Sequence, residues 1–427
     1  MTRRLESIAV GAAIILAAFG IAFVNVARGV PLDADVALTV LVFALAWGTM
    51  LAGVRVLAPR AVTYPLVAAA ALGAVGIIEV YRLDPGLAGR QRWWFLVGAA
   101  GAVAGLAWLR STGLEALRRY RYLLLALGVV LLVLPLIPST SWLPIAGKTV
   151  NGSRLWVEIT LGSFSVQFQP GELAKLPILV FLASLLADRR PVAAVASHGR
   201  AAELRRLVPV AIAWAASFAV LVVQRDLGAS LLLFATFVTM LYAGTGNRAY
   251  LISGGALFGA GAVAAWFAFD HVQTRVEAWL RPFDDPFGTG YQIVQGLYAM
   301  GSGSLTGSGL GLGRPDLIPF AATDFIYAAV AEELGLTGSL SVLALYGLLV
   351  ASGAAIALAA RDQFRSMLAA GITFVFAIQT FLIVGGIVRL LPLTGITLPF
   401  MSYGGSSLLA NMLLLALLMR ISHEERA

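Results

Sequence analysis

The stretch SMLAAGITFVFAIQTFLIVGGIV occupies residues 366–388 and contains no charged side chain. A helix that crosses a bilayer needs about 20 mostly apolar residues, so this run is long enough to span a membrane. The rest of the chain is similar, since 59% of its 427 residues are hydrophobic and only 12% are charged. A soluble domain carries roughly 25% charged residues. The composition therefore predicts a polytopic membrane protein and excludes a soluble enzyme, a coiled coil, a disordered chain and a collagen-like fibre.

About twelve apolar runs of this kind follow one another, and they predict an all-α polytopic integral membrane protein. The spans are expected near 6–26, 35–57, 62–81, 93–109, 120–137, 170–187, 206–223, 227–244, 249–269, 323–352, 366–388 and 399–420. The run at 323–352 is long for one crossing, so we expect it to be tilted, partly outside the membrane, or broken at Gly335 or Gly338. The first run resembles a signal peptide but continues past Ala22 without a convincing cleavage site, which favours a retained span.

The charges divide unequally between the two sets of loops. With both termini in the cytoplasm, one set holds 18 basic and 7 acidic residues, while the remainder of the chain holds 12 basic and 15 acidic residues. Cytoplasmic loops of membrane proteins carry the excess of Lys and Arg. The pattern predicts an even number of spans with both termini inside, so the net charge of +8 needs no nucleic acid. The chain has no cysteine, which excludes disulfides and thiol chemistry.

Two long loops lie on the predicted outer side, at 138–169 and 270–322. Long ordered loops in compact proteins often carry function, so chemistry is expected to face outward. The second loop has six glycines within residues 301–313, whose backbone N–H groups could cradle a phosphate. As a phosphate motif the run is weak, because no strand and no Lys-Ser/Thr pair accompany it.

Ionisable residues inside predicted spans are functional candidates, because a charge in a membrane costs free energy unless it is paired or lines a water-filled cavity. These residues are Glu79, Glu172, Lys175, Asp226, Asp324, Glu332, Glu333 and Arg389. Glu172 and Lys175 are three residues apart, so they share a helix face and can pair, either for function or as an anchor. Asp226 and Asp324 could equally cap their helices. The two adjacent glutamates need a partner, for which we consider Arg389 or an arginine from a loop.

Two further segments have unusual chemistry for their positions. Asp284-Asp285-Pro286, in the second long loop, could supply a general base or metal ligands, or could simply start a turn. The segment LPLTGITLPFMSYGG at 391–405 interrupts a helix with prolines and glycines. Irregular backbone at membrane depth persists only where it lines a cavity or is buried in protein.

Five motifs occur together and in order: GKTVNGSRLWVEI…FQPGELAKL, QRDLG, RPFDDPFGTGYQIVQGLYAMGSGSLTGSGLGLG, TDFIYAAVAEELGLTGS and LPLTGITLPFMSYGGSSLLANM. In this order they resemble the SEDS family of shape, elongation, division and sporulation proteins, over about residues 75–422. The resemblance implies a membrane-embedded peptidoglycan glycosyltransferase that polymerises lipid II and works with a class B penicillin-binding protein. Tyr81-Arg82-Leu83-Asp84-Pro85 favours the RodA-like members.

The resemblance also assigns site residues. It places the family's required aspartate at Asp285, with Gln292 in the same motif. It places substrate-binding positions at Glu172, Lys175, Gln169, Asp226, Arg90, Trp156 and Ser402. The chain departs from the family pattern at Arg225, where proline is usual, and at Gly171, where serine is usual. Two predicted spans before residue 60 also exceed the family's usual ten. We therefore divide the chain into an added N-terminal pair at 1–60 and a catalytic core at 61–427.

The implied reaction is an inverting displacement at C1 of MurNAc by a GlcNAc hydroxyl, with undecaprenyl diphosphate as the leaving group. Such a step needs a base and positive charge at the diphosphate. We expect Asp285 to be the base and Lys175 to face the leaving group, with Arg90, Arg154 and Arg281 as further donors. A divalent cation, Mg²⁺ or Mn²⁺, could be held by Asp285 or Glu172.

The expected location is the bacterial cytoplasmic membrane, with the active site on the outer face. Two alternatives remain at this point. A lipid-linked precursor flippase would suit many spans, although the two halves of the chain do not look equivalent. A non-catalytic scaffold for a penicillin-binding protein is the other.

Overall fold

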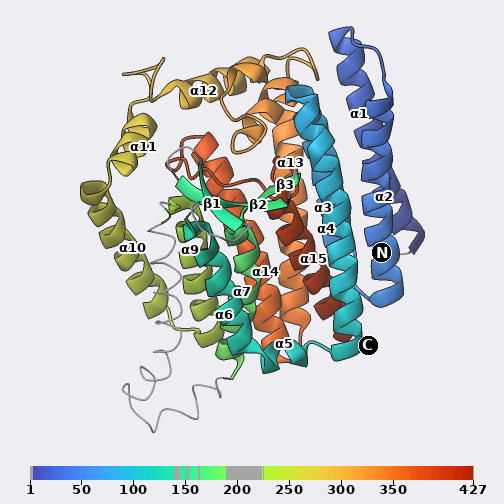
Figure 1. Ribbon diagram of the computed structural model, residues 1–427, viewed down its shortest axis with the longest axis vertical. Coiled ribbons are helices and arrows are strands. Elements are labelled where there is room, and N and C mark those ends of the chain that lie inside the picture. Colours follow the sequence, from blue (N-terminus) through green and yellow to red (C-terminus); the bar gives the residue numbers. More distant parts are fainter. Residues whose placement is uncertain are drawn as a thin grey trace.

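The computed structural model describes residues 3–138, 145–150, 153–161, 164–188, 224 and 226–426. Within these residues, ten helices are long and apolar enough to cross a membrane, and they form one bundle (Figure 1). They are α1 (Arg3–Arg28), α2 (Ala34–Leu57), α3 (Tyr64–Leu83), α4 (Pro85–Thr112), α7 (Pro170–Ala187), α9 (Leu227–Thr245), α10 (Ala249–Ala268), α13 (Ile326–Ala359), α14 (Gln363–Ile387) and α15 (Gly405–Glu424). The prediction of a helical polytopic membrane protein is confirmed at ten candidate spans.

The other two predicted spans differ in outcome. The run at 120–137 folds as a short helix, α6 (Arg121–Val133), followed by a 3₁₀ turn, η1 (Leu134–Leu136), that contains Pro135. Proline removes a backbone donor and favours a helix end at this point. A five-residue helix, α5 (Glu115–Arg119), precedes α6. The predicted span at 206–223 lies outside the described residues.

Local capping chemistry sets where several helices begin. The Asp33 side chain accepts a hydrogen bond from the Val36 N–H at the start of α2, and Asp362 does the same for Arg365 at the start of α14. Asp84 caps α4, where Pro85 occupies the first turn. Short acidic side chains satisfy the free N–H groups of a helix start, and proline there costs no hydrogen bond.

The two chain termini lie at the same end of the bundle. Near the N-terminus, Glu6 approaches Arg55 to 3.7 Å and accepts a hydrogen bond from Thr63. The backbone N–H of Val62, the residue before Thr63, donates to the Ser422 hydroxyl of α15 at 2.9 Å. A common end for both termini agrees with an even number of crossings. Which side of the membrane this end faces stays a prediction.

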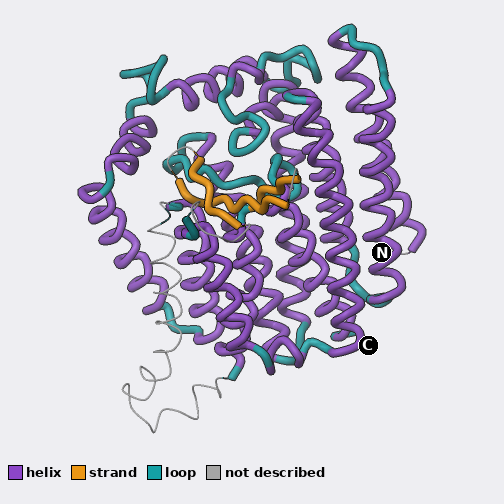
Figure 2. The backbone as a smooth tube through the Cα atoms, viewed as in Figure 1, coloured by secondary structure: helices purple, strands orange, loops and turns teal. Residues whose placement is uncertain are grey.

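The opposite end carries the two predicted long loops, and both contain regular structure. The first forms an antiparallel sheet of β1 (Ile145–Val150), β2 (Ser153–Leu161) and β3 (Phe164–Phe168), in which Lys148 pairs with Trp156 (Figure 2). The second contains α11 (Asp270–Leu280), α12 (Tyr291–Gly303) and a 3₁₀ turn, η3 (Pro315–Leu317). The expectation of an all-α protein is therefore corrected, because the structure also contains one small antiparallel sheet.

Two breaks in regular structure shape the interior. Gly335 has φ +67° and kinks α13, which confirms a break at one of the two predicted glycines. The second break is the irregular segment, residues 388–404, between α14 and α15. Phe400, Met401 and Ser402 of this segment are almost fully buried, and a Cβ on Gly76 of α3 would lie 2.4 Å from the Met401 carbonyl oxygen. The irregular backbone is thus packed inside protein, one of the two arrangements that membrane depth allows.

Candidate functional site

The first part of the site is the start of α7. Pro170 occupies the first turn of this helix, and Glu172 and Lys175 follow on one face. The Lys175 ammonium lies 2.7 Å from a Glu172 carboxylate oxygen, and both side chains are buried. Lys175 also donates to the Gln379 amide oxygen of α14 at 3.3 Å, and the Gln379 amide donates to the Thr397 carbonyl at 2.7 Å. The predicted pair is confirmed, and it joins α7 to α14 and to the irregular segment.

Asp226 lies beside this pair at the start of α9. Its carboxylate accepts a hydrogen bond from the Ala229 N–H at 2.9 Å, so the predicted capping role is confirmed. Burial raises the pKa of the Asp226 carboxyl, and nearby Glu172 raises it further; the Ala229 N–H, and then Arg275 and Lys175, act in the opposite direction. The net pKa lies above the ordinary value. We call Glu172, Lys175, Asp226 and Arg275 the α7 cluster.

Arg275 brings the second long loop to this cluster. Its guanidinium donates to the carbonyls of Leu393 and Thr394 in the irregular segment, at 3.3 and 3.4 Å. One turn later in α11, the Trp279 indole donates to the Arg389 carbonyl at 3.0 Å, and the Arg389 guanidinium donates back to the Trp279 carbonyl. The proposed pairing of Arg389 with the two adjacent glutamates is therefore wrong, because Arg389 holds α11 instead.

Ser402 and Gln292 hold backbone near the end of the second long loop. The Ser402 hydroxyl accepts from the Leu398 N–H at 2.9 Å and donates to the Thr323 carbonyl. The next side chain, Asp324, accepts from the Thr323 hydroxyl at 3.1 Å, and burial raises the pKa of its carboxyl. Gln292 of α12 donates to the Pro319 carbonyl at 3.1 Å. These contacts fix the chain that leads from the loop into α13.

Asp285 lies in a different environment, in the exposed turn between α11 and α12 (Figure 1). One carboxylate oxygen accepts from the backbone N–H and the hydroxyl of Thr289, at 2.8 and 3.2 Å, while the Asp285 carbonyl accepts from the Gly290 N–H at 3.0 Å. Within the described residues, no hydrogen bond or ion pair joins Asp285 to the α7 cluster. The aspartate therefore organises a turn; its side chain is exposed, and within the described residues its second carboxylate oxygen accepts no hydrogen bond.

The remaining predicted site residues surround the same end of the bundle. The Arg90 guanidinium lies 6.0 Å from the ring centre of Tyr403, in the irregular segment, and the side chain is exposed. Arg154 donates to the Ile137 carbonyl at 3.2 Å, and the half-buried Trp156 follows it in β2. Arg281 is exposed directly after α11. At Gln169, the backbone N–H donates to the Ser406 hydroxyl at 2.8 Å.

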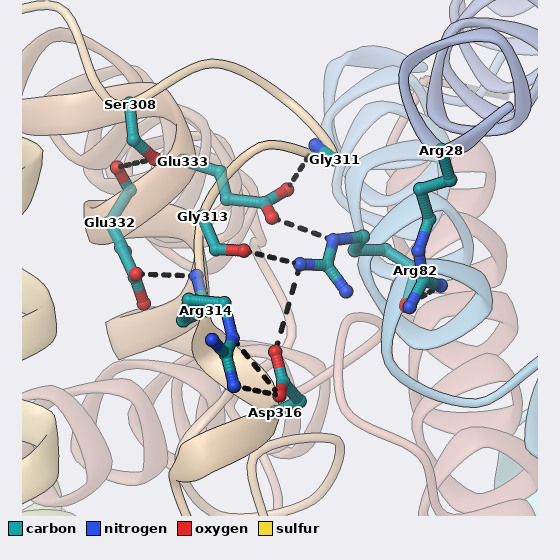
Figure 3. A network of polar contacts seen from close by, with 9 residues as sticks. All are labelled: Arg28, Arg82, Ser308, Gly311, Gly313, Arg314, Asp316, Glu332 and Glu333. Atoms are coloured by element: carbon teal, nitrogen blue, oxygen red, sulfur yellow. Dashed lines mark hydrogen bonds and ion pairs between the residues drawn. The ribbon is translucent and has the colours of Figure 1, made fainter.

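The glycine run predicted as a weak phosphate cradle contacts two glutamates of the protein instead (Figure 3). We call residues 304–314 the glycine loop. The Gly311 N–H donates to a Glu333 carboxylate oxygen and the Arg314 N–H to a Glu332 carboxylate oxygen, both at 2.7 Å. The partner of Glu333 is Arg82, whose Nε lies 2.7 Å from its carboxylate. The donors that a phosphate would need are therefore occupied, which contradicts the phosphate interpretation.

Sequence reasoning missed three members of these networks: Arg82, Arg275 and Gln379. Arg82 had a usable signal, because it ends a predicted span and two adjacent buried glutamates needed a cation. Gln379 and Arg275 had none, since a single amide in an apolar run and one arginine in a long loop are both common. Among the described residues, no group of three or more His, Cys, Asp or Glu is arranged to hold a metal ion.

Comparison with known proteins identifies the family to which this chain belongs. The model of the FtsW/RodA/SpoVE family, described as "Cell cycle protein", matches residues 54–427. This chain belongs to that family. It is 41% identical to the peptidoglycan glycosyltransferase RodA of Mycobacterium tuberculosis over 97% of this chain and 89% of that protein. It is 35% identical to stage V sporulation protein E of Bacillus subtilis, over 72% of this chain and 80% of that protein.

Solved structures of the family have the same fold. A chain from a structure described as "Structural coordination of polymerization and crosslinking by a peptidoglycan synthase complex" matches with a TM-score of 0.68 at 28% identity, over 86% of this chain and 98% of that chain. The rod shape determining protein RodA of Thermus thermophilus matches with a TM-score of 0.60 at 26% identity, over 86% and 98% of the two chains. The family model begins within α2, whereas the mycobacterial alignment takes in most of α1 and α2.

Proposed function

We propose that this multi-pass membrane protein is a peptidoglycan glycosyltransferase of cell elongation that polymerises lipid II into glycan strands. The observation that carries the proposal is its 41% identity to a peptidoglycan glycosyltransferase RodA over 97% of the chain. The polar residues that the family resemblance singled out lie at one end of the bundle, which is where a substrate with a membrane-anchored diphosphate would present its sugars.

Asp285 is the general base of the proposed reaction. Its open carboxylate oxygen takes the proton from the GlcNAc 4-hydroxyl of one lipid II as that oxygen bonds to C1 of the MurNAc of another. The bond between C1 and the diphosphate oxygen breaks, and undecaprenyl diphosphate leaves with inversion at C1. Thr289, which donates twice to the other carboxylate oxygen, orients the base. A positioned base of this kind contributes about 10²–10⁴-fold to a rate.

Positive charge for the leaving diphosphate comes from the arginines at this end. Arg90 and Arg281 are exposed, and a guanidinium suits bidentate contact with phosphate oxygens. Arg154 is a further donor on β2. Lys175 is committed to Glu172 and Gln379, so it supports the floor of the site through α7 and contacts the diphosphate only if that pairing loosens.

A divalent cation, Mg²⁺ or Mn²⁺, would fit Asp285 better than Glu172, and Asp285 would then serve as its ligand in place of the base role. The Asp285 carboxylate is exposed with one oxygen open, whereas Glu172 is buried against Lys175. Magnesium is commonly held by one or two carboxylates together with substrate phosphates, which agrees with the lack of a larger ligand group in the described residues. When bound, the ion would neutralise charge on the diphosphate.

We further propose that both termini lie in the cytoplasm of a bacterial cytoplasmic membrane, with the sheet, α11 and α12 on the outer side. The excess of arginine at the opposite end supports this orientation. A class B penicillin-binding protein is the proposed partner. Support comes from the similarity to a chain of a peptidoglycan synthase complex whose description names polymerization and crosslinking.

The test is reconstitution into liposomes with fluorescent lipid II on the outer face, with and without the penicillin-binding protein and EDTA. We expect glycan polymer from lipid II that is already outside, and a lower rate in EDTA if the cation contributes. Movement of lipid II across the bilayer without polymer would instead indicate the flippase alternative.

A further inference from the structure

The first observation is a buried arginine that joins three parts of the chain. Arg82, at the end of α3, is 2% exposed. Its Nε donates to Glu333 of α13 at 2.7 Å, and one Nη donates to the Gly313 carbonyl of the glycine loop at 2.7 Å (Figure 3). Such a buried pair is favourable only when its geometry is good and its remaining polar atoms are satisfied. The two hydrogen bonds of Arg82 join the glycine loop to α3 and α13, while its other Nη is left without a partner among the described residues.

The glycine loop is continuous with the turn that holds Asp285. Helix α12 begins directly after that turn and ends at Gly303, where a Cβ would lie 1.9 Å from the Ala331 carbonyl oxygen of α13. At the α13 kink, the Leu336 and Thr337 N–H groups donate to the Ser304 and Leu305 carbonyls at 3.0 and 3.1 Å. The turn, α12, the glycine loop and the first part of α13 thus form one connected unit.

The C-terminal end of α1 contacts both the end of α3 and the glycine loop of this unit. Asn25 and the Tyr81 hydroxyl of α3 share a buried hydrogen bond at 3.0 Å. Arg28 donates to the Arg82 carbonyl at 2.9 Å, as Figure 3 shows. Gly311 of the glycine loop lies so close that a Cβ there would be 3.1 Å from the Ala27 Cβ. Helix α1 precedes the region that the family model matches, which begins at residue 54.

Two further carboxylates lie near Arg82: Asp316, whose oxygen is 3.9 Å from one Nη, and Glu79 on the same helix as Arg82. Glu79 lies three residues earlier on α3, so the two side chains share a face. It is fully buried, and neither of its carboxylate oxygens has a hydrogen-bond partner among the described residues. One Nη of Arg82 is likewise buried without a partner there. An arginine released from Glu333 therefore has an alternative acceptor one turn away.

We propose that the C-terminal end of α1, through Asn25 and Arg28, is a positioning element for Asp285, because it keeps Arg82 on Glu333 and away from Glu79. The contacts of α1 fix the end of α3 and cover the glycine loop, which excludes water from the ion pair. Without them the glycine loop loosens, and α12 and the Asp285 turn lose their orientation. The inference rests on the proposed catalytic role of Asp285.

The experiment uses the full chain in lipid nanodiscs and compares wild type with the double variant Asn25→Leu/Arg28→Ala. We expect amide hydrogen exchange of residues 304–314 to become about tenfold faster, and lipid II polymerisation to fall about tenfold in turnover with little change in apparent KM, since small misplacements of a catalytic group are costly. Phe19→Ala is the matched control, because Phe19 projects from the exposed face of α1 and is 73% exposed. This control should change neither quantity.

Two further outcomes decide the inference. Adding Glu79→Gln to the double variant removes the competing carboxylate, so it should slow the exchange and restore most of the polymerisation rate. Unchanged exchange in the double variant, or no effect of Glu79→Gln, would overturn the proposal. If instead exchange responds as expected but Asp285→Ala polymerises at the wild-type rate, the catalytic assignment fails and the structural role of α1 stands.

Discussion

The Asp285 turn and the α7 cluster both carry acidic side chains that the sequence marked as functional, yet they differ in almost every physical respect. Asp285 is exposed and keeps one carboxylate oxygen open. Glu172 and Lys175 are buried and hold each other at 2.7 Å. A free group on a turn can move to a substrate and exchange a proton. A buried ion pair instead holds helices together. Removing one of its two partners leaves the other charge buried and unpaired.

The largest effect is expected at the turn. Asp285→Ala should lower the polymerisation rate by about 10²–10⁴-fold, because the proton acceptor is lost. Its stability should change little, since the side chain is exposed and its bonds to Thr289 lie within one surface turn. The measurement is polymerisation of fluorescent lipid II together with thermal unfolding in detergent.

Asp284→Ala is the matched control, because Asp284 is an adjacent exposed carboxylate in the same turn. It should keep a rate within about threefold of wild type if Asp285 is the base. Equal losses in the two variants would show that the turn needs negative charge generally and would remove the special role of Asp285.

The α7 cluster should respond in stability. Lys175→Met should destabilise the fold by about 3–5 kcal/mol, because it leaves the Glu172 carboxylate buried and unpaired. Thermal unfolding in nanodiscs measures this loss. The double variant Glu172→Leu/Lys175→Met removes both charges and should recover most of the stability. A double variant as unstable as the single one would show that the pair itself, rather than the orphaned charge, matters.

A substitution at Ser402 tests whether this predicted site residue acts in stability, like the α7 cluster, or in catalysis, like Asp285. Ser402→Ala leaves the buried Leu398 N–H and Thr323 carbonyl without this partner, so it should cost about 1–3 kcal/mol of stability. We expect an activity loss no larger than this destabilisation explains. A strong fall in turnover with normal unfolding would place Ser402 with Asp285 instead.

The smallest effect is expected at the other end of α7, where Asp188 forms an exposed ion pair. Partial burial raises the pKa of its carboxyl, but hydrogen bonds from Arg121 and Arg118 outweigh this and lower the pKa below the ordinary value. The pair therefore adds stability above about pH 4, the ordinary carboxyl pKa, and loses it as the pH falls through the lowered value. Because water screens the pair, Asp188→Asn should cost only about 0.5 kcal/mol.

Unfolding of wild type and Asp188→Asn across pH 3–7 checks this sign. The difference between the two proteins should be present at neutral pH and vanish toward pH 3. A difference that grows on acidification would contradict the lowered pKa. Together with the Lys175→Met measurement, this result compares the stability contributed by a buried ion pair and by an exposed ion pair at the two ends of α7.

Sequence patterns predicted what depends on near neighbours in the chain. The uncharged run that became α14 and the spacing of Glu172 and Lys175 are both local, and the structure confirms them. The glycine kink in α13 was predicted for the same reason. Helix α11 was missed because it is amphipathic and short, so a search for apolar runs passes over it.

Contacts between distant segments could not be predicted in this way. Glu333 had several arginines to choose from, and only the fold brings Arg82 from α3 to it, 251 residues away. The small sheet depends on pairing across turns that the apolar pattern does not encode. The family resemblance supplied Asp285, which no periodicity would have separated from Asp284.

The irregular segment has a consequence for how the protein is made. Its backbone receives hydrogen bonds from Gln91, Tyr346 and Gln379, all of which precede it in the chain. Translation runs from the N-terminus, so these partners are already synthesised when the segment leaves the ribosome. A chain that terminates just before residue 388 would leave those buried side chains without acceptors. We therefore expect nonsense mutations just before codon 388 to be as damaging as much earlier ones.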